Sequence, residues 1–424
     1  MGISILAAVI IAAIFYFFGR NKAHRQRVAR QEGIPHSLPF YHGIYAALLT
    51  FDFAIVAAIA ASILQAILMP PTLDAAGFKV SSGDADAFSI TAYIVPIVTC
   101  IAALFGGFLA TKRIDVEFRA RNAAERLILL LMISCSAIAI LTTFGIVFSL
   151  LFEAIRFFEQ INFFSFLLGT LWSPQQAFGV TDVSDIQHIF GFIPVISGTL
   201  LITVIAICVA GPIGLLSAIY LSDYASARVR SVAKPVLEIL AGVPTVVYGF
   251  FAALTVAPFL RGIGEGIGLD VSSESALAAG LVMGIMIIPF VSSLSDDVIN
   301  AVPQSLRDGS YGLGATKAET ITKVVLPAAL PGIVSALMLA ISRAIGETMI
   351  VVMAAGLAAN LTINPLEAVT TVTVQMVTLL TGDQEFDSAK TLASFALGLA
   401  LFVITLILNV IALRVVRKYR EQYD

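Results

Sequence analysis

Long apolar runs alternate with short polar segments along the whole chain. A helix that crosses a bilayer needs about 20 apolar residues, and periodic polar positions are missing from these runs. The runs lie near residues 3–19, 41–69, 88–110, 127–152, 192–221, 235–260, 275–295, 331–357 and 391–413. They predict an all-α polytopic membrane protein with about nine transmembrane helices.

The basic residues gather in every second segment between the runs. With the N-terminus outside, one side of the membrane receives 20 of the 25 Lys and Arg residues, in segments 20–30, 111–126, 222–235, 296–330 and 414–424. Cytoplasmic loops carry the excess of Lys and Arg in membrane proteins. Basic residues follow the first run rather than precede it, so we expect a retained span and not a cleaved signal. The sequence thus predicts a bacterial inner-membrane protein with an external N-terminus and a cytoplasmic C-terminus.

Composition supports this class and excludes others. Of the 424 residues, 58% are hydrophobic and 12% are charged, whereas soluble domains are about 25% charged. The three cysteines and four histidines show no metal-ligand spacing, so we expect no metal site. No GxxxxGK[ST] motif occurs, and we expect ATP hydrolysis in a separate subunit, with no cofactor bound by this chain. Nothing indicates catalytic residues or nucleic-acid binding, and membrane lipid is an expected partner.

A polar segment between the seventh and eighth runs has its own pattern. Residues 307–332 read RDGSYGLGATKAETITKVVLPAALPG, which favours two short helical pieces broken at Gly314, because glycine adopts positive φ easily. Pro327 and Pro331 mark the way into the eighth span. Such a helix pair on the cytoplasmic face is suited to docking on another protein, and an ordinary connector is the alternative.

The same segment is similar to the loop of ABC-importer permeases. That loop has the pattern Glu-Ala-Ala, three residues, Gly, nine residues, and Ile-x-Leu-Pro; the corresponding positions here are Asp308, Gly309, Ser310, Gly314, Val324, Leu326 and Pro327. The glycine and Leu-Pro match at the required spacing, while the first triplet keeps only an acid and small residues. The resemblance implies that residues 307–327 form a coupling loop that fits a groove on an ATPase subunit.

Longer stretches resemble the phosphate-specific permeases of the PstC type. They include EILAGVPTVVYGFFA at 238–252 and SRAIGETMIVVMAAG at 342–356. The resemblance covers residues 127–424 and implies a six-helix type I ABC importer permease core. Residues 1–126, with three further transmembrane helices, form an N-terminal extension whose role the sequence leaves open.

The function that this resemblance implies is that of a transmembrane permease subunit in an ATP-driven phosphate importer. Its partners would be a homologous PstA-like permease, a dimeric cytoplasmic PstB-like ATPase and an external PstS-like phosphate-binding protein. A permease for another oxyanion or small solute is an alternative. A proton-coupled secondary anion transporter is another, and for that class an inverted internal repeat would be expected.

Two charges, Arg343 and Glu347, lie inside the eighth apolar run. A lone guanidinium at the bilayer centre costs about 2.5 to 3.5 kcal/mol on insertion scales. In one continuous helix the i, i+4 spacing puts both side chains on one face, close enough for an ion pair. Either this pair fixes helix packing, or Arg343 binds a tetrahedral oxyanion on the substrate pathway. Glu347 would then neutralise Arg343, or accept a hydrogen bond from the P–OH that sulfate lacks.

Weaker signals come from other polar residues within the spans. Pro244 is expected to break the sixth span, which makes Thr245 and Tyr248 candidates for the pathway lining, with interhelical hydrogen bonding as the alternative. Asp52 is a further intramembrane acid, to which the sequence assigns no role.

Overall fold

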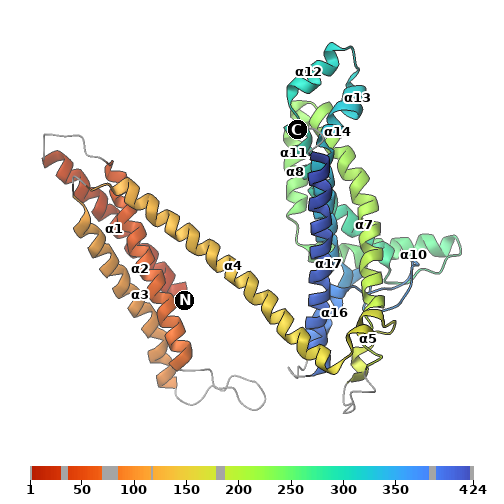
Figure 1. Cartoon of the computed structure of the whole chain (residues 1–424), viewed down its shortest axis with the longest axis horizontal. Helices are drawn as coiled ribbons and strands as arrows, with labels where there is room; N and C mark the ends of the chain where they lie inside the picture. The colour runs from red at the N-terminus through yellow and green to blue at the C-terminus, as the bar shows by residue number, and fades with distance from the viewer. Residues whose placement is uncertain are drawn as a thin grey trace. The chain divides into compact units, whose positions relative to one another are not determined.

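The computed structural model describes residues 2–29, 37–68, 85–115, 118–177, 187–381 and 388–420. The chain forms two compact units, Met1–Gly145 and Ile146–Asp424 (Figure 1). They divide within the long helix α4 (Ala120–Gln160), which also contains the boundary expected at residues 126 and 127.

The first unit is a bundle of long helices. It consists of α1 (Gly2–Ala29), α2 (Pro39–Leu68), α3 (Ala85–Arg113) and the first part of α4. Small residues bring α1, α2 and α3 together: a Cβ on Gly107 would lie 2.3 Å from the Phe15 ring, and one on Gly106 would lie 2.9 Å from Phe53. Membrane helices associate through close packing, because lipid is as apolar as their side chains, and small residues allow this close approach.

The second unit contains longer helices joined by short ones. The long helices are α7 (Ile193–Ile219), α11 (Ala276–Ala301), α14 (Leu326–Ile345) and α17 (Ala389–Arg420). The short helices are α5 (Phe163–Leu168), η1 (Pro174–Ala177), α8 (Ala227–Ala241), α9 (Thr245–Phe251), α10 (Ala257–Gly266), α12 (Gln304–Gly312), α13 (Lys317–Thr320), α15 (Met349–Ala354) and α16 (Val372–Leu380). Three wide π-helical turns, η2 (Tyr220–Tyr224), η3 (Ala252–Val256) and η4 (Ile321–Val325), continue α7, α9 and α13.

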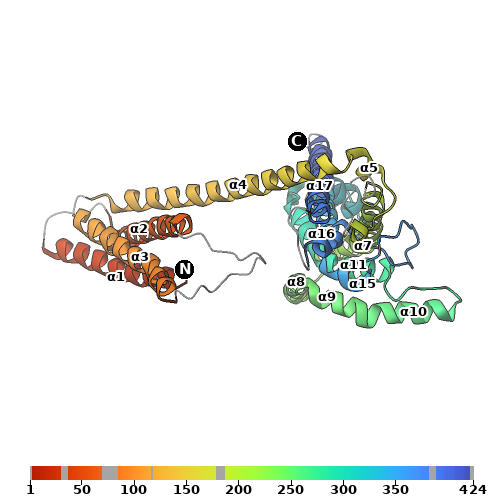
Figure 2. The same ribbon diagram turned by 90° about the horizontal axis from the view of Figure 1, so that it is seen from below.

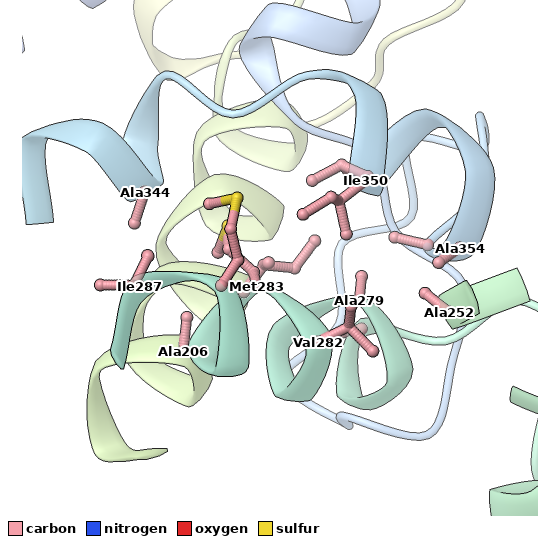
Figure 3. Close-up of a cluster of buried hydrophobic side chains, with 14 of the residues drawn as sticks. Ala206, Ala252, Ala279, Val282, Met283, Ile287, Ala344, Ile350 and Ala354 are labelled. Atoms are coloured by element: carbon pink, nitrogen blue, oxygen red, sulfur yellow. The ribbon is translucent and has the colours of Figure 1, made fainter. Parts of the chain in front are cut away.

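Helix α11 is the centre of the second unit and packs against both α7 and α14 (Figures 1 and 2). Glycines again make the contact close, since a Cβ on Gly280 would lie 2.6 Å from Ile205 and one on Gly284 would lie 2.9 Å from Val209. The core cluster beside them contains Met283 and Ile287 (Figure 3).

The prediction of nine spans is confirmed among the described residues. Helices long and apolar enough to cross a membrane cover residues 4–26, 39–64, 94–113, 120–160, 193–224, 245–266, 276–301, 317–345 and 389–414. The described part of the chain has no strand beyond one isolated bridge between Trp172 and Phe190. The all-α class is therefore confirmed as well.

Two of the predicted spans are interrupted in the structure. The run at 235–260 is two helices, because α8 ends at Ala241 and α9 begins after Pro244. The run at 331–357 is not one helix either, since helical structure extends without interruption from Lys317 to Ile345 and then breaks.

The eighth span does not begin at residue 331, as expected from the sequence, and Pro327 lies inside a helix that begins at Lys317. The π-helical turn η4 ends just before Pro327, and the Leu326 N–H bonds to the Ile321 carbonyl five residues back. A proline ring collides with the carbonyl four residues before it in a regular α-helix. A wide turn moves this carbonyl aside and lets the helix continue.

Candidate functional site

The eighth span breaks at Gly346, Glu347 and Thr348, between α14 and α15. Figure 3 shows the chain leaving the helix after Ala344 and entering the next one near Ile350. The Glu347 carboxylate turns back onto α15, where its Oε1 accepts hydrogen bonds from the Met349 N–H at 3.0 Å and the Ile350 N–H at 3.4 Å. This local bond offers the backbone an alternative to a continuous helix.

The expected ion pair between Arg343 and Glu347 is therefore wrong. The i, i+4 argument holds only within one helix, and the two residues lie on opposite sides of a break. Glu347 is 9% exposed and caps α15 instead. Thr373 of α16 also stabilises the break, since its hydroxyl donates to the Glu347 carbonyl at 2.8 Å.

Arg343 lies in the last turn of α14 with an exposed side chain. Its guanidinium carbon is 5.6 Å from the centroid of the Phe290 ring on α11. Within the residues that the structure describes, Arg343 has no ion pair. A guanidinium over an aromatic face is stabilised electrostatically while its N–H donors stay available. Arg343 can thus present its planar fork of donors to an anion.

Helix α9 carries the two other candidate lining residues and packs against α15. The contact passes through Gly249, where a Cβ would lie 2.7 Å from the Met353 sulfur. The Tyr248 hydroxyl donates to the Leu240 carbonyl at 2.9 Å and so bridges the break between α8 and α9. Thr245 is half-buried at the start of α9.

The four candidate pathway residues belong to neighbouring elements of the second unit, but their side chains do not bond to one another in the described structure. Two helix breaks, one before α9 and one before α15, meet where those short helices pack together. The breaks free backbone groups, which in a membrane is tolerated only where protein or water covers them. The role of these residues in the pathway remains a prediction.

The expected coupling segment, residues 307–327, lies at one end of the second unit (Figure 1). The two helical pieces are confirmed as α12 and α13, and Gly314 between them has a φ of +84°. Asp308 is exposed on α12, where it accepts a hydrogen bond from the Gln304 amide at 3.0 Å. Leu326 and Pro327 are half-buried in the continuous helix that follows.

A fixed framework holds this segment to the bundle. Arg307 of α12 is 8% exposed, and its guanidinium bonds to the Asp223 carboxylate and, at 2.9 Å, to the Ile299 carbonyl. The hydroxyls of Ser310 and Thr320, 2.9 Å apart, connect α12 to α13. Leu313, in contrast, is 92% exposed. The segment thus combines an anchored side with an apolar tip that nothing in the described chain covers.

A second charged cluster near the same end was not predicted from the sequence. Asp296 of α11 is 2% exposed and accepts from Arg230 at 2.9 and 3.1 Å, from Lys234 at 3.1 Å and from Asn300 at 2.9 Å. Hydrogen bonds to Asp297 and Asp296 raise the pKa of Lys234. The sequence signal that could have predicted this cluster is the Asp296-Asp297 pair at the end of an apolar run, because acids at the edge of the membrane need cationic partners.

No group of His, Cys, Asp or Glu that could hold a metal ion occurs among the described residues.

Comparisons with known proteins agree with these features. Residues 210–421 match the family model of the binding-protein-dependent transport system inner membrane component, and residues 5–76 match that of a phosphate ATP-binding cassette transporter family. The probable ABC transporter permease protein YqgH of Bacillus subtilis is 30% identical over 65% of this chain and 85% of its own length. The phosphate transport system permease protein PstC 1 of Mycobacterium tuberculosis is 32% identical over 61% of this chain and 83% of its own.

Solved structures of transporters also match part of the chain. The inward-facing MetNI methionine ABC transporter matches with a TM-score of 0.39 and 18% identity, over 54% of this chain and 94% of that one. An amino acid ABC transporter with histidines matches with a TM-score of 0.39 and 20% identity, over 56% and 99%.

Proposed function

This chain belongs to the family of binding-protein-dependent transport system inner membrane components, as a permease of the PstC type, and we propose that it forms one half of the phosphate pathway of an ATP-driven importer. It is a multi-pass inner-membrane transport subunit and not an enzyme. Membership of the family implies an ATPase and an external binding protein as partners. We assign these roles to PstB-like and PstS-like proteins, with a PstA-like permease supplying the other half and with ATP bound only by the ATPase.

Arg343 is the observation that carries this proposal. A guanidinium in the membrane part of a chain is costly unless something compensates it, and the ion pair expected from the sequence does not form. Phosphate is a tetrahedral oxyanion, and arginine binds such oxygens through two parallel N–H donors. The exposed fork over Phe290 is therefore assigned to phosphate during its passage.

Glu347 then acts mainly on structure, because its carboxylate holds the start of α15. This cap fixes the path of the chain directly after Arg343. Any discrimination between phosphate and sulfate by this carboxylate would require it to leave the cap. Thr245 and Tyr248 are assigned to the wall beside α15, with Tyr248 bracing the break before α9.

Coupling to ATP hydrolysis is assigned to residues 307–327, with Asp308 and Gly314 at the docking surface. The exposed Leu313 supports this assignment, since it gives the tip of the segment an apolar side chain that can enter a groove on a partner. Leu326 and Pro327 lie in the helix that runs from Lys317 to Ile345 and so joins the docking surface to Arg343. We assign this end to the cytoplasm and the N-terminus to the outside, an orientation that the excess of basic residues supports.

Uptake of radioactive phosphate by cells that depend on this chain tests the pathway. We expect Arg343→Gln to abolish uptake and Arg343→Lys to retain only part of it, because lysine lacks the planar fork. Arg261→Gln is the matched control, since Arg261 bonds to Ser273 away from the proposed site. Normal phosphate uptake by Arg343→Gln would refute the pathway, and uptake of sulfate in preference to phosphate would favour the other-oxyanion alternative.

Coupling is tested by placing a charge at the apolar tip. Leu313→Asp should abolish uptake without loss of folded protein, because Leu313 is 92% exposed. Ile363→Asp is the matched control, as Ile363 is 88% exposed on a connection expected outside the membrane. Uptake that is unaffected by Leu313→Asp, or that continues without an ATPase and follows the proton gradient, would reject ATP-driven coupling.

A further inference from the structure

The first unit contains a hollow of about 440 Å³ at its basic end, between α2 and the start of α4. We call it the basic hollow; it is lined by Tyr45, Phe118, Arg119, Asn122, Ala123, Arg126, Leu127 and Leu130. None of these residues takes part in the proposed phosphate pathway. The hollow thus needs its own explanation.

Its polar and apolar sides follow from the spacing along α4. Asn122 and Arg126 are four residues apart on α4, which places them on one helix face. Arg119 directly precedes the helix and lines the same hollow. Leu127 and Leu130 continue this face toward the apolar part of the helix, where Leu130 is 61% exposed. The hollow is therefore cationic at the start of α4 and apolar where α4 enters the membrane.

Aromatic rings form the back wall. Tyr45 of α2 is 4% exposed, and its ring centroid lies 4.9 Å from that of Phe118. Both residues pack with the core of the first unit around Ala46 and Ile114. Because packing fixes this wall, the hollow is a built feature of the unit and not a gap between loose side chains.

The two arginines of the hollow are not neutralised within the described residues, whereas their neighbour is. Arg121 forms an ion pair with Glu125 at 2.8 Å and lies 5.9 Å from the Tyr41 ring. Arg119 and Arg126 have no ion pair in the parts of the chain that the structure describes. No described side chain occupies their N–H donors, which can therefore bind an anion.

We propose that the basic hollow binds an anionic phospholipid, with Arg119 and Arg126 on the headgroup phosphate and an acyl chain along Leu127 and Leu130. Basic pockets between membrane helices bind anionic headgroups, and arginine pairs with phosphate oxygens through two donors. A soluble anion would use the cationic end but leave the apolar side unfilled. The cationic and apolar sides of the hollow match the headgroup and the acyl chain of a lipid, so a lipid fits the hollow better than a soluble anion does.

Native mass spectrometry of the full chain in detergent, with phosphatidylglycerol or phosphatidylcholine added, tests this inference. The unaltered chain should retain one phosphatidylglycerol more tightly than phosphatidylcholine. A basic residue near an anionic lipid contributes about 1 kcal/mol, so Arg119→Gln and Arg126→Gln should each weaken phosphatidylglycerol binding about 5-fold, and together roughly 30-fold.

Arg121→Gln is the matched control and should leave lipid binding unchanged, because Glu125 already occupies that arginine. The double change to lysine, Arg119→Lys with Arg126→Lys, should retain most of the preference for the anionic lipid. If the double glutamine variant fails to fold, the loss of phosphatidylglycerol binding by each single variant is compared with that of the control.

Three results would overturn the inference. Equal retention of both lipids by the unaltered chain would show that no anionic headgroup is bound. An equal loss with Arg121→Gln would show a diffuse charge effect. Displacement of the lipid by inorganic phosphate at similar concentration would make the hollow a site for the free anion. None of these depends on the proposed phosphate pathway, so failure of one proposal leaves the other intact.

Discussion

Two replacements of Glu347, by alanine and by glutamine, distinguish a helix cap from an ion pair, because the two roles predict different losses of unfolding free energy. Its carboxylate is 9% exposed and accepts two backbone N–H groups of α15. Alanine removes both bonds, and loss of a capping side chain costs about 0.5 to 2 kcal/mol. Burial puts Glu347→Ala toward the upper part of that range. Glutamine keeps an acceptor oxygen in the same place but makes neutral hydrogen bonds, so Glu347→Gln should cost about 1 kcal/mol or less, and less than Glu347→Ala.

An ion pair with Arg343 would give a different result. Removal of one partner of a buried pair costs about 3 to 5 kcal/mol, because the other charge is left uncompensated. Glutamine and alanine would then be similarly harmful. The free energy of unfolding of the purified chain, from denaturant titration in detergent, provides the comparison. A loss with Glu347→Gln that equals the loss with Glu347→Ala would refute the cap as the main role of this side chain.

Three further substitutions, with Gly309→Ala as a control for the third, test the packing and the backbone. Gly198→Ala would put a Cβ 2.1 Å from the Thr370 carbonyl oxygen, and such overpacking should lower the unfolding free energy by about 1 to 3 kcal/mol; an unchanged value would contradict the close approach. Asp296→Ala leaves two cations without their shared acid, and because these are partly exposed we expect a loss of about 2 to 3 kcal/mol in the same titration. Gly314→Ala should cost about 1 to 2 kcal/mol at its φ of +84°, whereas Gly309→Ala, within α12, should be neutral or stabilising.

The apolar runs of the sequence predicted the features of the fold that depend on burial in lipid. A span is recognised by length and composition, so the number of spans and the helical class follow from the apolar runs alone. The two-piece form of residues 307–327 followed from one glycine, because Gly314 is the position that needs a positive φ. These features depend on local chemistry and need no knowledge of neighbouring elements.

The breaks within spans could be predicted only in part. Pro244 marked the first break, as a proline does. The second break carries no proline and depends on Glu347 turning back to cap α15 and on Thr373 bonding to its carbonyl, a contact 26 residues away. The helix passes Pro327 because a π-helical turn precedes it. Spacing rules assume a regular helix, and here they predicted a contact between Arg343 and Glu347 that the break in the helix prevents.

The uninterrupted helix from Lys317 to Ile345 has a mechanical consequence. It contains 29 residues and is therefore about 43 Å long at 1.5 Å per residue. A rigid rod of this length works as a lever: a tilt of about 5° at the end near Gly314 swings the far end sideways by roughly 4 Å. Arg343 lies near that far end, and the helix ends two residues after it. A tilt of the helix would therefore change the position of this charge, which is the one assigned to phosphate in the proposed pathway.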